Sequence, residues 1–518
     1  MHIVMVAAEN DTLPGGKVGG IGDVLRELPR ALAAMDIDVT VISPAYGLVD
    51  RLPGAERQAT LDVGFRGVPH AVDLYDLGVT GATGVRQLAL EHPGFSPRGP
   101  GQVYCDDPPG RPFATDASKF ALFSAAVAEA LVQGSLGEVD VLHLHDWHAA
   151  LVLLLRRHHP RYRGLRSLRC VYTIHNLALQ GVRPLRGDAS SLEQWFPNLR
   201  YAQSAVIDPR WTDCVNPMAI GIRLAEAVHT VSPTYAGEIR QPSAIESHGF
   251  HGGEGLEREL GAAHAEGRLH GFLNGCDYSG KRPRAPGWGA LVEMMREENL
   301  RWAGQRASVS AAHFVAQERL RGLTKIRPGL LLTSVGRATD QKLRLARETG
   351  SDGRPALEGV LDALGDSGLL LMLGSGDPAL EQFLAATAAR RENFIYLCGY
   401  SDRLSSALYA SGDLFLMPSS FEPGGISQLF AMRAGQPCLV HGVGGLRDTV
   451  THGVDGFVFN GDTLREQADR LVATVEDALA LRAEDAKQWK ALGKAAGRAR
   501  FPWQSTAEHC LELLYRSP

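Results

Sequence analysis

The stretch "DLFLMPSSFEPGGISQLFAMRAG" (residues 413–435) contains one acidic residue after its apolar start, Glu422. The residues before it are typical of a buried strand, and those after it have the spacing of a helix that ends at Gly435. Because glycine has no side chain, the Pro-Gly-Gly that follows Glu422 lets the backbone come close to a ligand. The free N–H groups of a helix start suit an anion. The stretch therefore predicts a carboxylate beside an anion site.

Two cations follow another apolar run. Arg337 and Lys342 in "LLLTSVGRATDQK" lie just beyond a predicted strand. Two positive charges at one strand end can neutralise a diphosphate, since arginine offers a planar fork of donors and lysine a point charge. A solvated basic loop is the alternative for either residue alone. The acid Glu422 at another strand end of the same half of the chain favours the binding site.

A further lysine lies in a glycine-rich loop near the N-terminus, "ENDTLPGGKVGGIGDV". Lys17 stands among four glycines, before a predicted helix that begins near Ile21, and this combination can hold a phosphate. The loop is not a Walker A motif, because Val18 follows the lysine, and it does not match the G-x-G-x-x-G fingerprint. A loop that is merely flexible remains the alternative.

Polar residues also end two predicted strands of the first half. In "VDVLHLHDWHAALVLLL", the residues His143, His145 and His148 could suggest a metal site, but a strand followed by a helix points them in different directions. A polar strand end that lines a cleft is the favoured interpretation. In "CVYTIHNLALQG", His175 and Asn176 could contact a sugar, since sugars are bound through several precisely placed polar groups. The alternative is a histidine whose hydrogen bonds are satisfied within a strand–helix turn.

The elements that must position these residues are short runs rich in Val, Ile and Leu, which alternate with helical patterns. Such runs are typical of parallel strands buried on both faces, so the fold class is α/β, with two facing doubly wound, Rossmann-like domains and a deep cleft between them. Ligands of such sheets bind beyond the carboxyl ends of the strands. The runs are "HIVMVAA", "DVTVISP", "VDVLHLH", "CVYTIHN" and "AVHTVSP", then "GLLLTSVG", "LLLMLGSG", "NFIYLCG", "DLFLMPS" and "PCLVHGV".

The domain boundary is expected where Gly, Pro and basic residues accumulate, in "YSGKRPRAPGWG". We expect a first domain over residues 1–276, joined by a C-terminal helix over 504–518, and a second domain over 277–503. Residues 50–115 read as a turn-rich insertion in the first domain.

The composition excludes several classes of protein. The 518 residues are 44% apolar and 21% charged, and the net charge of −5 gives no sign of a nucleic-acid or anionic membrane partner. No apolar stretch is long enough to span a membrane, and "MHIVMVAAEN" indicates a strand rather than a signal sequence. The seven scattered cysteines indicate reduced thiols and a cytoplasmic protein. The sequence does not determine the oligomeric state.

Seven segments, in family order, resemble the glycogen and starch synthases of the bacterial type. They are "KVGGIGDV", "HDWHAALV", "YTIHNLALQG", "VHTVSPTYAGEI", "GFLNGCD", "GRATDQK" and "FEPGGISQLFAMRAGQPCLV…VGGLRDTV". The resemblance implies two facing Rossmann-like domains of the GT-B type and glucosyl transfer with retention. It also implies ADP-glucose as donor, the non-reducing end of an α-1,4-glucan as acceptor, and no metal or other cofactor.

The resemblance also assigns roles to individual residues. The catalytic residues would be Glu422, His175, Arg337 and Lys342. Those that bind the substrate would be Lys17, Gly19, Gly20, Asp23, Asn176, Asn274, Tyr400, Gly425, Ile426 and Ser427. Tyr400 would stack on adenine, and the N–H groups of residues 425–427 would bind the phosphate.

Several positions depart from the family pattern and leave alternatives open. The usual threonine after Lys17 is Val18, the cysteine after Glu-Pro is Gly424, and the glycine after Lys342 is Leu343. The partner acid that many related retaining transferases carry eight residues after the glutamate is Phe430 here. These departures leave the acceptor open. The alternatives are a related transferase that uses UDP-glucose or a small acceptor, a catalytically silent glucan-binding protein, and a glucan phosphorylase.

Overall fold

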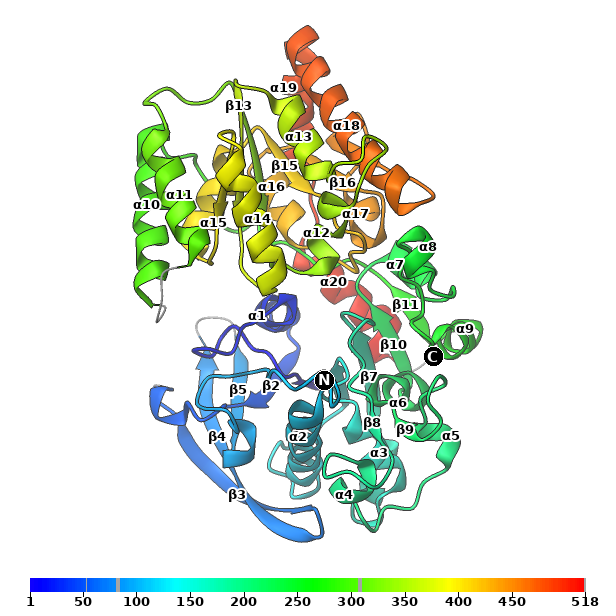
Figure 1. Cartoon of the computed structure of the whole chain (residues 1–518). Coiled ribbons are helices and arrows are strands. Elements are labelled where there is room, and N and C mark those ends of the chain that lie inside the picture. Colours follow the sequence, from blue (N-terminus) through cyan, green and yellow to red (C-terminus); the bar gives the residue numbers. More distant parts are fainter. Residues whose placement is uncertain (53, 81–83, 306–309, 517–518) are drawn as a thin grey trace. The chain divides into compact units, whose positions relative to one another are not determined.

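The computed structural model describes residues 1–52, 54–80, 84–305 and 310–516 (Figure 1). The chain divides into two compact units. The first unit is Met1–Ser243, Gly252–Gly275 and Pro502–Pro518, and the second is Ala244–His251 and Cys276–Phe501. Of the predicted C-terminal helix 504–518, residues 517–518 lie outside the described residues.

A short segment predicted for the first domain belongs to the second unit. It contains helix α8 (Ile245–His248), and its backbone accepts hydrogen bonds from two side chains of that unit. Gln467 Nε2 donates to the carbonyl of His248 over 2.9 Å, and Arg344 Nη2 donates to that of Ile245 over 3.4 Å. The ring of His251 stacks on Phe421, with 3.9 Å between the ring centroids.

The first unit contains a nine-stranded sheet in the order β11-β10-β7-β6-β1-β2-β5-β4-β3. The strands from β11 to β5 run parallel, and β4 and β3 are antiparallel. In chain order the strands are β1 His2–Val6, β2 Asp38–Pro44, β3 Glu56–Phe65, β4 Val68–Thr80, β5 Val85–Glu91, β6 Val141–His145, β7 Arg169–Ile174, β10 Ala227–Thr230 and β11 Leu269–Gly271. Two short strands, β8 Arg183–Pro184 and β9 Cys214–Val215, pair separately.

The helices of the first unit follow the strands in α/β alternation. They are α1 Gly20–Ala33, α2 Ala114–Val132, α3 Leu151–His158, α4 Leu192–Trp195, α5 Gln203–Val206, α6 Pro217–Leu224, α7 Pro233–Glu238, α9 Glu257–Ala265 and α20 Trp503–His509, which continues as a π-helix, Cys510–Tyr515.

The second unit contains a six-stranded parallel sheet in the order β14-β13-β12-β15-β16-β17. Its strands are β12 Leu330–Val335, β13 Gly368–Leu373, β14 Phe394–Leu397, β15 Leu414–Met417, β16 Cys438–His441 and β17 Gly456–Phe459. Its helices, besides α8, are α10 Trp288–Gln305, α11 Ala311–Gly322, α12 Asp340–Arg347, α13 Ala356–Leu364, α14 Pro378–Arg390, α15 Asp402–Ser411, α16 Ser427–Arg433, α17 Gly444–Thr449, α18 Leu464–Glu484 and α19 Ala486–Ala496.

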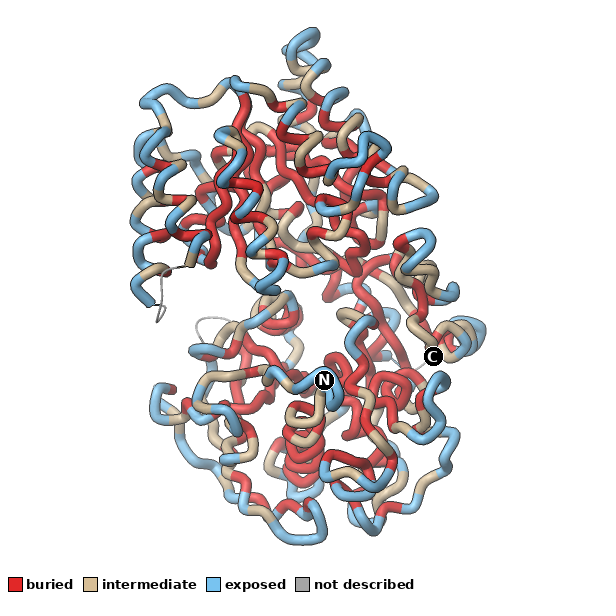
Figure 2. The backbone as a smooth tube through the Cα atoms, in the orientation of Figure 1, coloured by how far each residue is buried: buried red, intermediate tan, exposed pale blue. Residues whose placement is uncertain are grey.

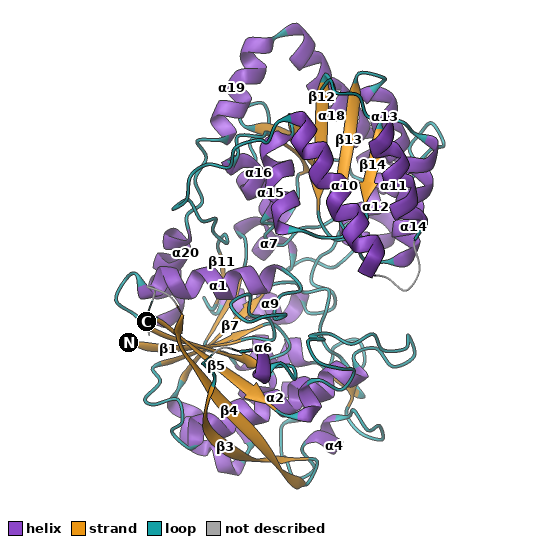
Figure 3. Cartoon of the chain, turned by 90° about the vertical axis from the view of Figure 1, so that its left-hand side faces the viewer, coloured by secondary structure: helices purple, strands orange, loops and turns teal. Residues whose placement is uncertain are grey.

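All ten predicted runs form parallel strands, and both sheets are covered by helices on two faces (Figure 3). The residues of the parallel strands are mostly buried, and buried segments run through the middle of each unit (Figure 2). In β1, Val4 and Val6 pack in one core cluster, while Ile3 and Met5 pack in another. Successive strand residues point to opposite faces of a sheet, so this partition shows that both faces are buried. The prediction of two doubly wound, Rossmann-like domains is confirmed.

The predicted turn-rich insertion is wrong in one respect, because residues 56–91 form three strands, β3, β4 and β5, that extend the first sheet. Strand β3, "ERQATLDVGF", alternates exposed and buried residues along its second half, as expected of a strand with one solvated face. Such an alternating strand contains no continuous apolar run, which is the pattern that predicts the parallel strands.

Within the described residues, no helix is both long and apolar enough to cross a bilayer. All seven cysteines lie in the described part of the chain, and none forms a disulfide.

Candidate active site

A pocket in the second unit opens where β12, β13 and β15 end. Its empty volume, with the adjoining open solvent included, is about 360 Å³, and it is lined by Gly336, Arg337, Lys342, Gly374 and Ser419, among others. The two predicted cations therefore share one pocket. The Arg337 side chain is exposed, and its guanidinium forms no hydrogen bond or ion pair with any residue that the structure describes. An unpaired guanidinium at the mouth of a pocket is available to an anion.

Glu422 is buried beside this pocket and forms an ion pair with the ammonium of Lys342. The contact joins the first turn of α12 to the loop after β15. Two further bonds hold these segments together: Ser420 N–H donates to the Gln341 carbonyl over 2.8 Å, and Gln341 Nε2 donates to the Phe421 carbonyl over 3.1 Å. The structure thus brings together an acid and a lysine that are 80 residues apart in the sequence.

The glycines of "VGGLRDTV" support the loop that carries Glu422. Gly445 N–H donates to the Glu422 carbonyl over 3.0 Å. A Cβ at Gly444 would lie 2.0 Å from that same carbonyl oxygen, and a Cβ at Gly445 would lie 2.2 Å from the Gly424 oxygen. Only glycine allows such a close approach of two backbones. These glycines therefore pack against the loop around Glu422.

The start of α16 and Tyr400 complete the predicted residues of the second unit. Gly425 and Ile426 lead into the helix at Ser427, and no side chain caps its first turn. Tyr400 follows β14, is exposed, and donates its hydroxyl to Asp402 over 2.5 Å. It is not among the residues that line the pocket described above.

In the first unit, the glycine-rich loop already binds an anionic group of the protein itself. The buried carboxylate of Glu9 accepts N–H bonds from Val18 over 3.1 Å and from Gly19 over 2.5 Å, and the Tyr104 hydroxyl donates to it over 2.8 Å. Gly20 begins α1 directly after this contact. The two N–H groups at the loop are therefore occupied by Glu9, which the sequence analysis did not foresee.

Lys17 is likewise paired within the loop region. Its ammonium lies 2.6 Å from Asp23 and 3.3 Å from Asp11, and Arg26 pairs with the same two carboxylates. Arg26 also pairs with Glu27 at 2.6 Å, so acidic side chains already neutralise both cations. The glycine-rich loop, predicted to bind phosphate, thus differs from the pocket of the second unit, where Arg337 is unpaired among the described residues.

Histidines gather at the carboxyl ends of β6 and β7. Nδ1 of His145 lies 2.9 Å from Nε2 of His175. His143 bonds to Thr173 over 2.6 Å and to the hydroxyl of Tyr515, in the C-terminal segment, over 2.8 Å. Burial lowers the pKa of all three histidines well below the usual value. They are therefore neutral at physiological pH.

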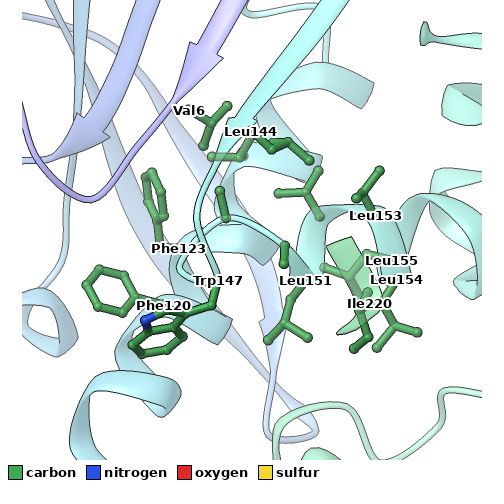
Figure 4. Packing of buried hydrophobic residues seen from close by; sticks show 14 of the residues in the cluster. Val6, Phe120, Phe123, Leu144, Trp147, Leu151, Leu153, Leu154, Leu155 and Ile220 are labelled. Carbon is green, nitrogen blue, oxygen red and sulfur yellow. The ribbon is translucent and has the colours of Figure 1, made fainter. Parts of the chain in front are cut away.

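The segment after β6 is anchored in the core by Trp147. Its ring packs edge to face against Phe120, with 5.5 Å between centroids, among the leucines of α3 (Figure 4). Asp146 is buried, and burial raises the pKa of its carboxyl group. Its backbone N–H donates to the carbonyl of Thr173, on β7, over 2.8 Å. The strand ends that carry His145 and His175 are thereby held together.

The remaining predicted residues of the first unit lie on separate turns. Asn176 accepts the N–H of Ala178 over 3.0 Å, and Asn274 is buried after β11. In the part of the chain that the structure describes, no three or more His, Cys, Asp or Glu side chains are placed to hold a metal ion. Sequence reasoning missed Glu9 and Gln341, and it did not foresee the pairing of His145 with His175. A buried acid directly after the first strand was the signal for Glu9.

Comparison with known proteins decides the family. Residues 2–261 match the family described as the starch synthase catalytic domain. The glycogen synthase of Anaeromyxobacter sp. (strain Fw109-5) is 34% identical over 531 residues, which cover 100% of this chain and 99% of the relative. The chain belongs to the glycogen synthase family. The predicted resemblance is confirmed, and the alternative functions are not favoured.

Other members and structures agree with this assignment. The glycogen synthase of Streptococcus gordonii is 33% identical over 537 residues and covers both chains fully. Residues 357–477 match the glycosyl transferases of group 1. The catalytic domain of starch synthase IV from Arabidopsis thaliana, solved with ADP and acarbose bound, superimposes with a TM-score of 0.75 at 27% identity, over 99% of this chain and 98% of that one. The chain is a glycosyltransferase of the GT-B fold.

A more distant likeness supports the fold alone. The sucrose-phosphate synthase of Thermosynechococcus elongatus superimposes with a TM-score of 0.55 at 17% identity, covering 99% of this chain and 98% of that one.

Proposed function

We propose that the protein transfers glucose from ADP-glucose to the non-reducing end of an α-1,4-glucan, with retention of configuration. The observation that carries the proposal is the pocket of the second unit, where Arg337 and Lys342 lie at strand ends and Lys342 pairs with Glu422. The relatives named as glycogen synthases, and the ADP bound to the plant starch synthase, support the choice of nucleotide and acceptor.

The leaving group is the part of the donor that needs cations. When the anomeric C–O bond breaks, positive charge develops on the sugar and negative charge on the ADP. Arg337, Lys342 and the N–H groups of residues 425–427 would stabilise the departing diphosphate, a contribution of several kcal/mol for fixed donors of this kind. The acceptor hydroxyl attacks from the face that the phosphate leaves and gives its proton to a phosphate oxygen, which accounts for retention.

The sugar and the base would be bound by other residues. Glu422 would accept hydrogen bonds from the glucose hydroxyls and orient the reacting carbon, and Lys342, paired with it, would link the sugar to the diphosphate. Tyr400, whose side chain is exposed, would stack on the adenine.

The first unit would supply the remaining sugar contacts. We propose this role for His175, Asn176 and Asn274, and for the loop residues Lys17, Gly19, Gly20 and Asp23. Because the N–H of Gly19 and the ammonium of Lys17 already bind carboxylates, this loop suits sugar hydroxyls better than a free diphosphate.

The direct test is release of ADP or UDP from the two nucleotide sugars, with and without glycogen. We expect release from ADP-glucose that depends on glycogen and exceeds release from UDP-glucose. Faster nucleotide release from UDP-glucose than from ADP-glucose would contradict the proposal. So would nucleotide release that is independent of glycogen but increases when a small sugar phosphate is added.

Arg337→Ala should lower both ADP affinity and turnover. Loss of one charge-assisted contact of about 1.5–3 kcal/mol corresponds to a loss of about 10- to 150-fold in affinity. Titration calorimetry with ADP measures it. Arg347→Ala is the matched control, since Arg347 is an exposed arginine at the end of α12, the helix that follows Arg337, and it pairs with Asp340 at 3.2 Å. Equal ADP affinity in the Arg337 variant and the unaltered protein would exclude this arginine from the donor site.

A further inference from the structure

The contact between His145 and His175 bears on which ring nitrogen of each histidine carries a hydrogen. The ring of His145 stacks on His143, with 4.2 Å between centroids, and its centroid lies 5.2 Å from that of His175. The 2.9 Å contact joins Nδ1 of His145 to Nε2 of His175. His145 is fully enclosed, whereas His175 keeps part of its surface accessible.

We propose that His145 positions His175 by donating its Nδ1–H to Nε2 of His175, so that His175 carries its own proton on Nδ1 and offers that N–H to a hydroxyl of the donor glucose. His145 is thus a positioning residue that acts through His175. The identity of the sugar in this inference rests on the proposed function. The assignment of the protons to ring nitrogens is independent of that function.

The direction of the hydrogen bond follows from the surroundings of His145. Both rings are neutral, so one N–H lies between them. Nε2 of His145 is buried and has no hydrogen-bond partner within the described residues. If His175 were the donor, His145 would have to carry its proton on this enclosed Nε2, as a buried N–H without an acceptor. Orphaned buried N–H groups are the rarer kind of unsatisfied polar group, so the arrangement favours the proton on Nδ1 of His145.

The consequence for His175 is a defined donor. Its Nε2 is then an acceptor for His145, and its Nδ1 carries a hydrogen. Nδ1 forms no hydrogen bond with the described residues and is not among the enclosed atoms of the protein. An N–H held in place before the substrate arrives orients a sugar hydroxyl without a reorganisation cost. The strand that leads to His175 is fixed separately, because the N–H of Asp146 donates to the carbonyl of Thr173 over 2.8 Å.

The tautomer can be measured without any substrate. In protein labelled with 15N-histidine, the ring nitrogen resonances distinguish Nδ1–H from Nε2–H, and a His175→Gln variant identifies the signals of His175. We expect Nδ1–H at neutral pH in the unaltered protein. A signal from Nε2–H would overturn the proposal, whatever the enzymatic activity.

The kinetic test uses variants at the same site. For His145→Ala we expect kcat with ADP-glucose to fall about tenfold, the scale of one lost hydrogen bond, while ADP affinity stays unchanged because ADP lacks the sugar. His145→Asn, whose amide N–H can replace Nδ1–H, should recover most of the loss. A normal kcat for His145→Ala, or no recovery with asparagine, would overturn the proposal.

His143→Gln is the matched control for burial. His143 lies on the same strand and is equally enclosed, but it bonds to Thr173 and Tyr515 rather than to His175. We expect His143→Gln to lower the stability of the protein and to leave kcat unchanged. If His143→Gln and His145→Ala lowered kcat equally, a specific role for His145 would be contradicted. If the unaltered protein releases no ADP from ADP-glucose, the proposed function fails, while the resonances of His175 still decide the tautomer.

Discussion

Glu422→Gln should lower kcat with ADP-glucose by at least about 100-fold, while ADP affinity stays nearly the same. Glutamine keeps the size of the side chain but removes the charge that pairs with Lys342. In the proposed reaction this carboxylate binds the glucose, which ADP lacks, so its loss affects turnover more than nucleotide binding. Steady-state kinetics and titration calorimetry with ADP measure the two quantities.

The control is Glu358→Gln. Glu358 belongs to the same unit, is mostly buried and pairs with Arg390 at 3.0 Å, but it lies on α13 and does not line the pocket. We expect normal turnover from this variant. Normal glucan elongation by the Glu422 variant would remove Glu422 from the mechanism.

Acid should destabilise the protein strongly, through the buried histidines of the first unit. Burial lowers the pKa of His143, His145 and His148 well below 6.5, and that of His229 to about 3. The unfolded chain binds protons at these histidines below pH 6.5, whereas the folded chain does not. Their stabilisation is therefore complete above pH 6.5 and is lost as the pH falls toward 3. Each histidine contributes up to about 1.4 kcal/mol per pH unit.

Thermal unfolding between pH 7.5 and 5, followed by circular dichroism, measures this loss. Asp146 acts in the opposite direction, since its raised pKa lets the folded state bind a proton first. His229→Gln should reduce the slope of stability against pH by about one proton. A melting temperature that stays constant from pH 7.5 to 5 would contradict the lowered pKa values of these histidines.

The fold was predictable where burial alone decides the local structure. All ten runs of Val, Ile and Leu form strands, because a parallel strand covered on both faces is apolar at most of its positions. The pair β3 and β4 could not be found in this way, since a strand at the sheet edge alternates between buried and exposed residues. The segment 244–251 was also assigned to the wrong unit. It is bound by Gln467 and Arg344, which are remote in the sequence, and local sequence patterns do not reveal such contacts.

The candidate site was predictable in its residues but less so in its contacts. Arg337 and Lys342 follow one strand and Glu422 another, and the order of the parallel strands brings them to the same edge. The occupation of the glycine-rich loop by Glu9 was not predictable, because nothing in the spacing of Glu9, Lys17 and the glycines indicates which group fills the loop.

By itself, the sequence determined which residues could do chemistry and that they end buried strands, because residue type and hydrophobic pattern are local properties. The tertiary structure alone decided which of them are already paired. Lys17 faces Asp23, Lys342 faces Glu422, and His145 faces His175, whereas Arg337 has no partner among the described residues. Hydrogen bonds and ion pairs depend on distances of about 3 Å, and such distances between remote residues exist only once the strands have paired and the core has packed.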